Sequence, residues 1–198
     1  MYGLTVITAP ASEPVSLTLA KAHLRIDHTA EDDLITGWIK AARELTELYT
    51  GKRWVTQSLR LTLSEWPTDS TGGICGAIRL PVEPVSAITL FKHYDTGGTE
   101  QTLVADTDYQ TWLDHSPPLV CPAIDDTWPD LQSGKVAPIK IEFTAGVAAG
   151  SVPEGVKTAI LMCIGNWDEN RGDQNVSIAR GLPPSAKAQL DFLWNGAY

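Results

Sequence analysis

The hydrophobic and polar positions follow a helical period near both ends of the chain and an alternating period between them. From residue 30 to residue 50, apolar residues recur every three or four positions in two rows. The first row is Leu34, Trp38, Ala41, Leu45 and Leu48, and the second is Ile35, Ile39, Ala42 and Tyr49. This spacing predicts a long amphipathic helix with a broad apolar face. Gly51 follows directly and predicts its end.

A short helix is predicted before the long one, over residues 19–25, with Thr18 as its N-cap. Thr29 is predicted to cap the long helix. Three acidic residues follow in its first turn, where they suit the positive end of a helix: Glu31, Asp32 and Asp33. Helix-start acids therefore explain this cluster better than a metal site does, because it lacks the ligand spacing of a calcium loop.

The middle of the chain changes to a period of two. From Val55 to Leu63, polar residues at the even positions alternate with mostly apolar ones, which predicts a half-buried strand. Residues 85–94 and 101–104 flank Asp95-Thr96-Gly97-Gly98, a hairpin signal. Residues 136–144 alternate again and predict the last strand.

A helical period returns after residue 152. Its apolar face consists of Ala159, Ile160, Cys163, Ile164 and Trp167. We expect this helix to pack on the earlier long helix, through Leu34, Trp38 and Leu45. The predicted fold class is therefore α+β, with a helical core and an inserted antiparallel β subdomain. The predicted parts are residues 1–53 (helical), 54–148 (β-rich) and 149–198 (C-terminal helices and a docking arm).

The last residues are unusually aromatic for a chain end. The segment after Pro183 predicts a short helix, and it carries Leu190, Phe192, Leu193, Trp194 and Tyr198. Ends of chains usually fray, so an aromatic end is often tied down. Two interpretations stay open, namely packing into the chain's own core and contact with a partner subunit. We take these five residues as the candidate partner interface.

The net charge argues against a protein that binds DNA tightly through its phosphates. The formal net charge is −9, and the 15 lysines and arginines are scattered rather than clustered. No apolar run approaches the roughly 18 residues that a membrane span needs. The first residues lack a basic start and an apolar stretch, so synthesis in a bacterial cytoplasm is expected, without a signal peptide.

The sequence contains no motif for catalysis, a cofactor or a metal. The three cysteines, Cys75, Cys121 and Cys163, are widely spaced, and the four histidines are dispersed. The glycine-rich stretches lack the ending of a phosphate loop. We therefore expect no catalytic, cofactor-binding or metal-binding residues.

Three segments, in this order, resemble the head–tail connector (adaptor, head-completion) proteins of long-tailed bacteriophages. The first is Leu17–Lys52, with its short helix, acidic step and Tyr49-Thr50-Gly51 ending. The second is the Leu-Pro…Pro-Val step over Leu80–Ile88. The third is Trp167-Asp168-Glu169-Asn170-Arg171, followed by Leu182-Pro183. The group that the chain resembles has a β-rich insertion between the helices.

The resemblance implies a structural virion protein without enzymatic activity. Family members imply a ring of about twelve copies that docks beneath the portal and extends the DNA channel toward the tail. The implied partners are further copies of the chain, the portal protein and a tail-side stopper or tail-terminator protein. DNA would pass without sequence-specific binding. The alternatives are another virion module, such as a tail-completion or decoration protein, and a small hydrolase built from dispersed His and Asp residues.

Overall fold

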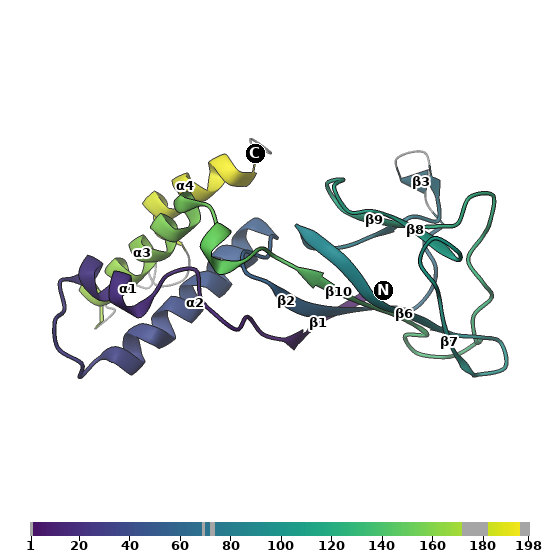
Figure 1. Cartoon of the computed structure of the whole chain (residues 1–198), viewed down its shortest axis with the longest axis horizontal. Coiled ribbons are helices and arrows are strands. Elements are labelled where there is room, and N and C mark those ends of the chain that lie inside the picture. The colour runs from purple at the N-terminus through teal and green to yellow at the C-terminus, as the bar shows by residue number, and fades with distance from the viewer. Residues whose placement is uncertain (1, 69, 72–73, 172–181, 195–198) are drawn as a thin grey trace. The chain divides into compact units, whose positions relative to one another are not determined.

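The structure is a computed structural model that describes residues 2–68, 70–71, 74–171 and 182–194 (Figure 1). The chain forms two compact units. The helical unit consists of Ala11–Val55 and Val147–Tyr198, and the β unit consists of Met1–Pro10 and Thr56–Gly146. The helical unit is therefore discontinuous in sequence, and the β unit is inserted into it.

The helical unit contains four α-helices and one short 3-10 turn among its described residues. They are α1 (Leu17–Leu24), α2 (Asp32–Thr50), the turn Ala149–Ser151, α3 (Glu154–Glu169) and α4 (Pro184–Trp194). Helix α3 packs against each of the other three helices. The predicted packing of the two long helices, α2 and α3, is thus confirmed.

The row of α2 that fills the core is the second one; from the first row, the half-buried Trp38 packs against this core, as expected. Ile35, Ile39 and Ala42 are fully buried against Ile160 and Ile164 of α3, in one apolar cluster. Leu34 and Leu48, from the first row, are exposed, and Leu45 is only half-buried. Our expectation that Leu34 and Leu45 pack on α3 is therefore wrong. The two rows lie side by side on the helix, so the sequence period fits both.

Two predicted helix caps are displaced. Ser16, not Thr18, caps α1, and its Oγ accepts a hydrogen bond from the N–H of Leu19 over 3.2 Å. Helix α2 starts at Asp32 without a side-chain cap, and Thr29 offers only its backbone carbonyl to the Asp32 N–H. The predicted end at Gly51 is confirmed, because Gly51 has a φ of 70° and donates to the Glu47 carbonyl.

The β unit is built on a five-stranded antiparallel sheet. Its order is β1 (Tyr2–Thr8), β2 (Gln57–Leu63), β10 (Ile139–Ala145), β6 (Val85–Tyr94) and β7 (Glu100–Thr102). A three-stranded sheet has the order β5 (Ile78–Arg79), β9 (Leu119–Pro122) and β8 (Tyr109–Trp112), and β3 (Ser70–Thr71) pairs with β4 (Ile74–Cys75). The predicted strands near 55–63, 85–94 and 136–144, and the hairpin between β6 and β7, are all present.

The core of the β unit lies on one face of the five-stranded sheet. Inward residues alternate along β2 and β10, as in Leu59, Leu61, Ile141 and Phe143, all of them fully buried. An aromatic group completes this core, in which the Trp66 and Trp128 rings stack at 4.7 Å and Phe91 meets Tyr109 edge-on at 5.0 Å.

The N-terminal residues differ from the expectation that residues 1–53 are helical. Strand β1 pairs along its length with β2, from Tyr2 opposite Leu63 to Thr8 opposite Ser58, and residues 1–10 belong to the β unit. A single short strand has little stability alone. It forms here because β2, about 55 residues later in the chain, supplies its hydrogen-bonding partner.

Candidate assembly surfaces

The C-terminal candidates fall into two classes. Leu190 and Leu193 are buried in the core of the helical unit, whereas Phe192 is 73% exposed. The side chain of Trp194, and Tyr198 as a whole, lie outside the described residues. Of the five candidates, Phe192 is thus the one whose described side chain is available to a partner.

Helix α4 is tied to α2 and to the residues just after it by polar contacts, as well as by its buried leucines. The Tyr49 hydroxyl donates to Asp191, and Lys52 Nζ donates to the Leu193 carbonyl over 3.1 Å. The Lys187 ammonium lies 5.6 Å from the centre of the Tyr49 ring. These contacts, with the buried leucines, fix the face of α4 that packs on the unit, and Phe192 lies outside that face, exposed to solvent.

The first apolar row of α2 forms a second exposed surface. Leu48 is 78% exposed, Leu34 and Ala41 are also exposed, and Trp38 and Leu45 are half-buried. From Leu34 to Leu48 this row extends about 21 Å along the helix at 1.5 Å per residue. A continuous apolar stripe on a helix is a common feature of protein interfaces. We call these five residues the α2 stripe.

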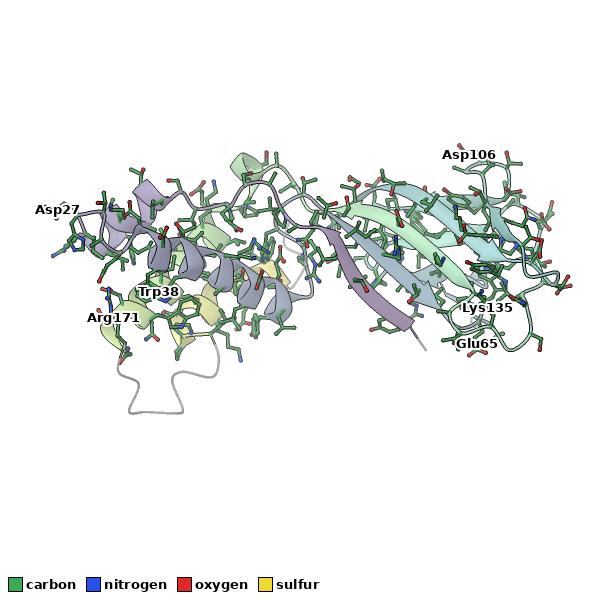
Figure 2. The ribbon with its side chains drawn as sticks, turned by 90° about the horizontal axis from the view of Figure 1, so that it is seen from below. Asp27, Trp38, Glu65, Asp106, Lys135 and Arg171 are labelled. Carbon is green, nitrogen blue, oxygen red and sulfur yellow. The ribbon has the colours of Figure 1, made fainter. Side chains whose placement is uncertain are left out.

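Arg171 packs against Trp38, near one end of the α2 stripe. Its guanidinium lies 5.2 Å from the centre of the Trp38 ring and donates to both carboxylate oxygens of Glu31, over 2.7 and 2.8 Å (Figure 2). It also donates to Asp168. These hydrogen bonds raise the pKa of Arg171 and lower that of Glu31. The bonds connect the start of α2 to the end of α3, and so give a physical role to the last residue of the Trp167–Arg171 motif.

The β unit exposes the outer strand of its large sheet. All seven residues of β1 are exposed or half-buried, and none of them carries a charge. Tyr2 is 64% and Val6 48% exposed. Both faces of this strand therefore meet solvent, and Figure 2 shows β1 at the margin of the sheet.

The negative charge is unequally distributed between the two units. The β unit holds 12 acidic and 5 basic residues, a formal charge of −7, and the helical unit holds 12 and 10, a charge of −2. Asp106 and Asp108 precede β8, and Asp125 and Asp126 follow its partner β9. The Ala123 N–H donates to the Asp108 carbonyl, so these two acidic loops are neighbours.

Among the described residues, the metal-binding and nucleophilic side chains are scattered or buried. The described residues contain no group of three or more His, Cys, Asp or Glu side chains arranged to hold a metal ion. His93 is buried beside Trp66, and burial lowers its pKa. Burial raises the pKa of the Cys163 thiol to about 12, which makes it a poor nucleophile.

Within the same described part of the chain, no helix is both long enough and apolar enough to cross a membrane.

Comparison with protein families gives a match over residues 14–100 to the phage gp6-like head–tail connector proteins. The matched region runs from the segment before α1 through α2 to the start of β7. It thus includes the first two of the three segments that suggested the resemblance. No curated protein matches the chain.

Several solved structures share the fold. A chain in the neck of an empty gene transfer agent (GTA) particle, computed with C6 symmetry, is 24% identical with a TM-score of 0.77, and the match covers 97% of this chain and 94% of the other. A chain in the virion of the native GTA particle is 23% identical with a TM-score of 0.74, covering 95% and 93%. A third, from the native neck computed with C12 symmetry, has 23% identity and a TM-score of 0.70, covering 94% of each chain.

The structural matches establish the α+β fold over nearly the whole chain. Together, the comparisons support a structural connector role. They confirm the resemblance predicted from the sequence motifs: over residues 14–100 the chain matches the head–tail connector family of bacteriophages.

Proposed function

We propose that this protein is a head–tail adaptor that forms a ring beneath the portal, extends the DNA channel and joins the head to the tail. The observation that carries the proposal is the connector-family match over residues 14–100. The shared fold with chains of symmetric GTA necks supports it, because those matches extend over both units of the chain.

The mechanism is multivalent docking rather than catalysis. Each copy contributes a modest contact to its neighbour, and closure of a ring of about twelve copies makes the assembly much more stable than any single contact. Within the helical unit, the α2 stripe is the candidate surface for contact with a neighbouring copy. Phe192, on the free face of α4, is the candidate anchor for the portal or for a neighbour.

The charge suits a channel that releases its DNA. With only 5 basic residues against 12 acidic ones, the β unit offers few partners to phosphates. An acidic surface repeated around a ring would repel the DNA backbone and prevent adhesion during packaging and ejection. The remaining partner is a tail-side stopper or tail-terminator protein on the opposite side of the ring.

Particle imaging tests this proposal directly. Particles assembled without the protein should contain filled heads that carry no tails, and tails should return when the protein is supplied. Electron microscopy of complete particles should then show its density between the portal and the tail. Density on the head surface or at the tail tip would instead identify a decoration or tail-completion protein.

A further inference from the structure

We propose that neighbouring copies join their large sheets edge to edge, with β1 of one copy pairing with β7 of the next. The inference rests on the proposed ring and adds an interface to it. The five-stranded sheet is open, with β1 and β7 as its two outer strands. Among the described residues, no strand pairs with the outer side of either one.

The hydrogen-bond register shows which backbone groups of β7 face outward. Leu103 donates its N–H to the Phe91 carbonyl over 2.8 Å, so Leu103 faces β6. In an antiparallel ladder, successive residues alternate between the two sides. Thr102 and Glu100 therefore face away from β6. The next residue in this series, Val104, also turns outward, but its N–H donates to the Asp108 side chain and its carbonyl accepts from the Asp108 N–H, so Glu100 and Thr102 are the open positions of this edge.

The same alternation, carried across the sheet, gives the free groups of β1. His93 lies opposite both Gln101 of β7 and Ile139 of β10, and Ile139 lies opposite Leu63 of β2. His93 bonds toward β7, so Ile139 bonds toward β2, and Leu63 bonds toward β10. Tyr2, opposite Leu63, therefore turns its N–H and C=O outward. Two further residues of β1 follow it in this orientation: Leu4 and Val6.

An edge with free backbone groups specifically fits another extended strand. Natural proteins usually protect such edges with charged residues or proline, and residues 2–8 contain neither. Val6 and Tyr2 are largely exposed as well, so β1 combines free hydrogen-bonding groups with apolar side chains. This combination favours a partner strand over solvent.

The partner we infer is β7 of a second copy, because a ring needs two different surfaces on each subunit. Pairing of β1 with β1 would give a closed dimer and could not continue. Charge also permits the β1–β7 contact. Strand β1 is uncharged, and the one carboxylate of β7, Glu100, is already paired with Lys92 and Lys140 at 2.8 and 3.0 Å. The edges can therefore meet although each β unit carries a charge of −7.

Proline at the outward positions tests the inference, since it removes a free N–H without removing a ladder bond. Val6→Pro disables the β1 edge, and Thr102→Pro disables the β7 edge. Ile124→Lys, at a position that is 78% exposed on a loop after β9, is a control that leaves both edges intact. Val6→Lys repeats the β1 test in case proline disturbs the β unit. Thermal melting checks that each variant is folded, and native mass spectrometry of the full chain gives its oligomeric state.

We expect the wild type and Ile124→Lys to form oligomers, and each edge variant alone to stay monomeric. An equimolar mixture of Val6→Pro and Thr102→Pro retains one working β1 and one working β7, and should give dimers with one copy of each. A single contact lacks the avidity of a closed ring, so the mixture is measured at the highest soluble concentration.

Three results would overturn the inference. They are β1-edge variants that assemble like the wild type, dimers of Thr102→Pro alone, which would indicate β1–β1 pairing, and a wild-type chain that is monomeric at every concentration. None of these results bears on the proposed position of the protein between head and tail, which particle imaging tests separately.

Discussion

The guanidinium of Arg43 donates a hydrogen bond to Glu47 over 3.0 Å, one helical turn later in α2, and both side chains are almost fully buried. Arg43 also donates to Glu13 over 2.7 Å, in the segment before α1. Glu47 in turn accepts the backbone N–H of Trp54 over 3.0 Å. This buried pair therefore holds three separate segments of the helical unit together.

Removing Arg43 should destabilise the protein strongly. Arg43→Ala leaves the buried Glu47 carboxylate without its main counter-charge, a change that typically costs about 3–5 kcal/mol. Arg60→Ala is the matched control, because the Arg60–Glu142 pair is much more exposed and should contribute about 0–1 kcal/mol. Chemical denaturation of both variants measures the difference. Equal losses would show that burial of the Arg43 pair is unimportant.

The two rows of α2 should respond differently to truncation. Ile39→Ala removes a buried side chain from the contact with α3 and should cost about 2–5 kcal/mol of unfolding free energy. Leu48→Ala removes an exposed one and should change it by less than about 0.5 kcal/mol. Thermal or urea unfolding gives both values. A large loss for Leu48→Ala would place the α2 stripe inside the folded subunit.

A charge placed on the α2 stripe should weaken assembly without changing the stability of the folded subunit. Leu48→Glu should melt like the wild type, because the residue already meets solvent. If the stripe contacts a neighbouring copy, the variant should form fewer oligomers by native mass spectrometry. Lys40→Gln, which lowers the net charge by the same one unit at an exposed residue of α2 outside the stripe, is the control for charge. Unchanged assembly of Leu48→Glu would remove the stripe from the proposed interface.

Helix α4 offers a matched pair of substitutions. Leu190→Ala should destabilise the helical unit by about 2–5 kcal/mol, because Leu190 is fully buried. Phe192→Ser should leave the melting temperature unchanged and reduce incorporation into portal-bearing particles. Thermal melting and immunoblots of purified particles measure the two effects. Normal incorporation of Phe192→Ser would exclude Phe192 as the docking anchor.

Acid should weaken the β6–β7 region through Glu100. Hydrogen bonds from Lys92 and Lys140 lower the pKa of Glu100 from 4.5 to about 2. Because folding lowers the pKa of Glu100, its ionised carboxylate stabilises the folded state at pH values above about 4.5. This stabilisation is lost as the pH falls from about 4.5 to 2. Melting curves between pH 6 and pH 2 should therefore show a smaller acid loss for Glu100→Gln than for the wild type. Identical pH profiles would contradict the assignment.

Local patterns in the sequence were sufficient for the elements that depend on near neighbours. The period of α2, its end at Gly51, and the β6–β7 hairpin all follow from residues a few positions apart. The order of helices and strands, with the three connector-like segments, also led to the α+β fold and to the resemblance to the connector family that residues 14–100 match. These features need no information about distant contacts.

Tertiary structure decided which surfaces are buried. Both rows of α2 satisfy the helical period, and only the position of α3 selects Ile35 and Ile39 for the core. In the same way, Leu190 and Phe192 are both large apolar residues near the end of the chain, and the packing of α4 buries Leu190 and exposes Phe192. Strand β1 exists because β2 supplies its hydrogen bonds. A sequence period gives the angle of a side chain around its own element, whereas burial depends on a neighbour that comes from elsewhere in the chain.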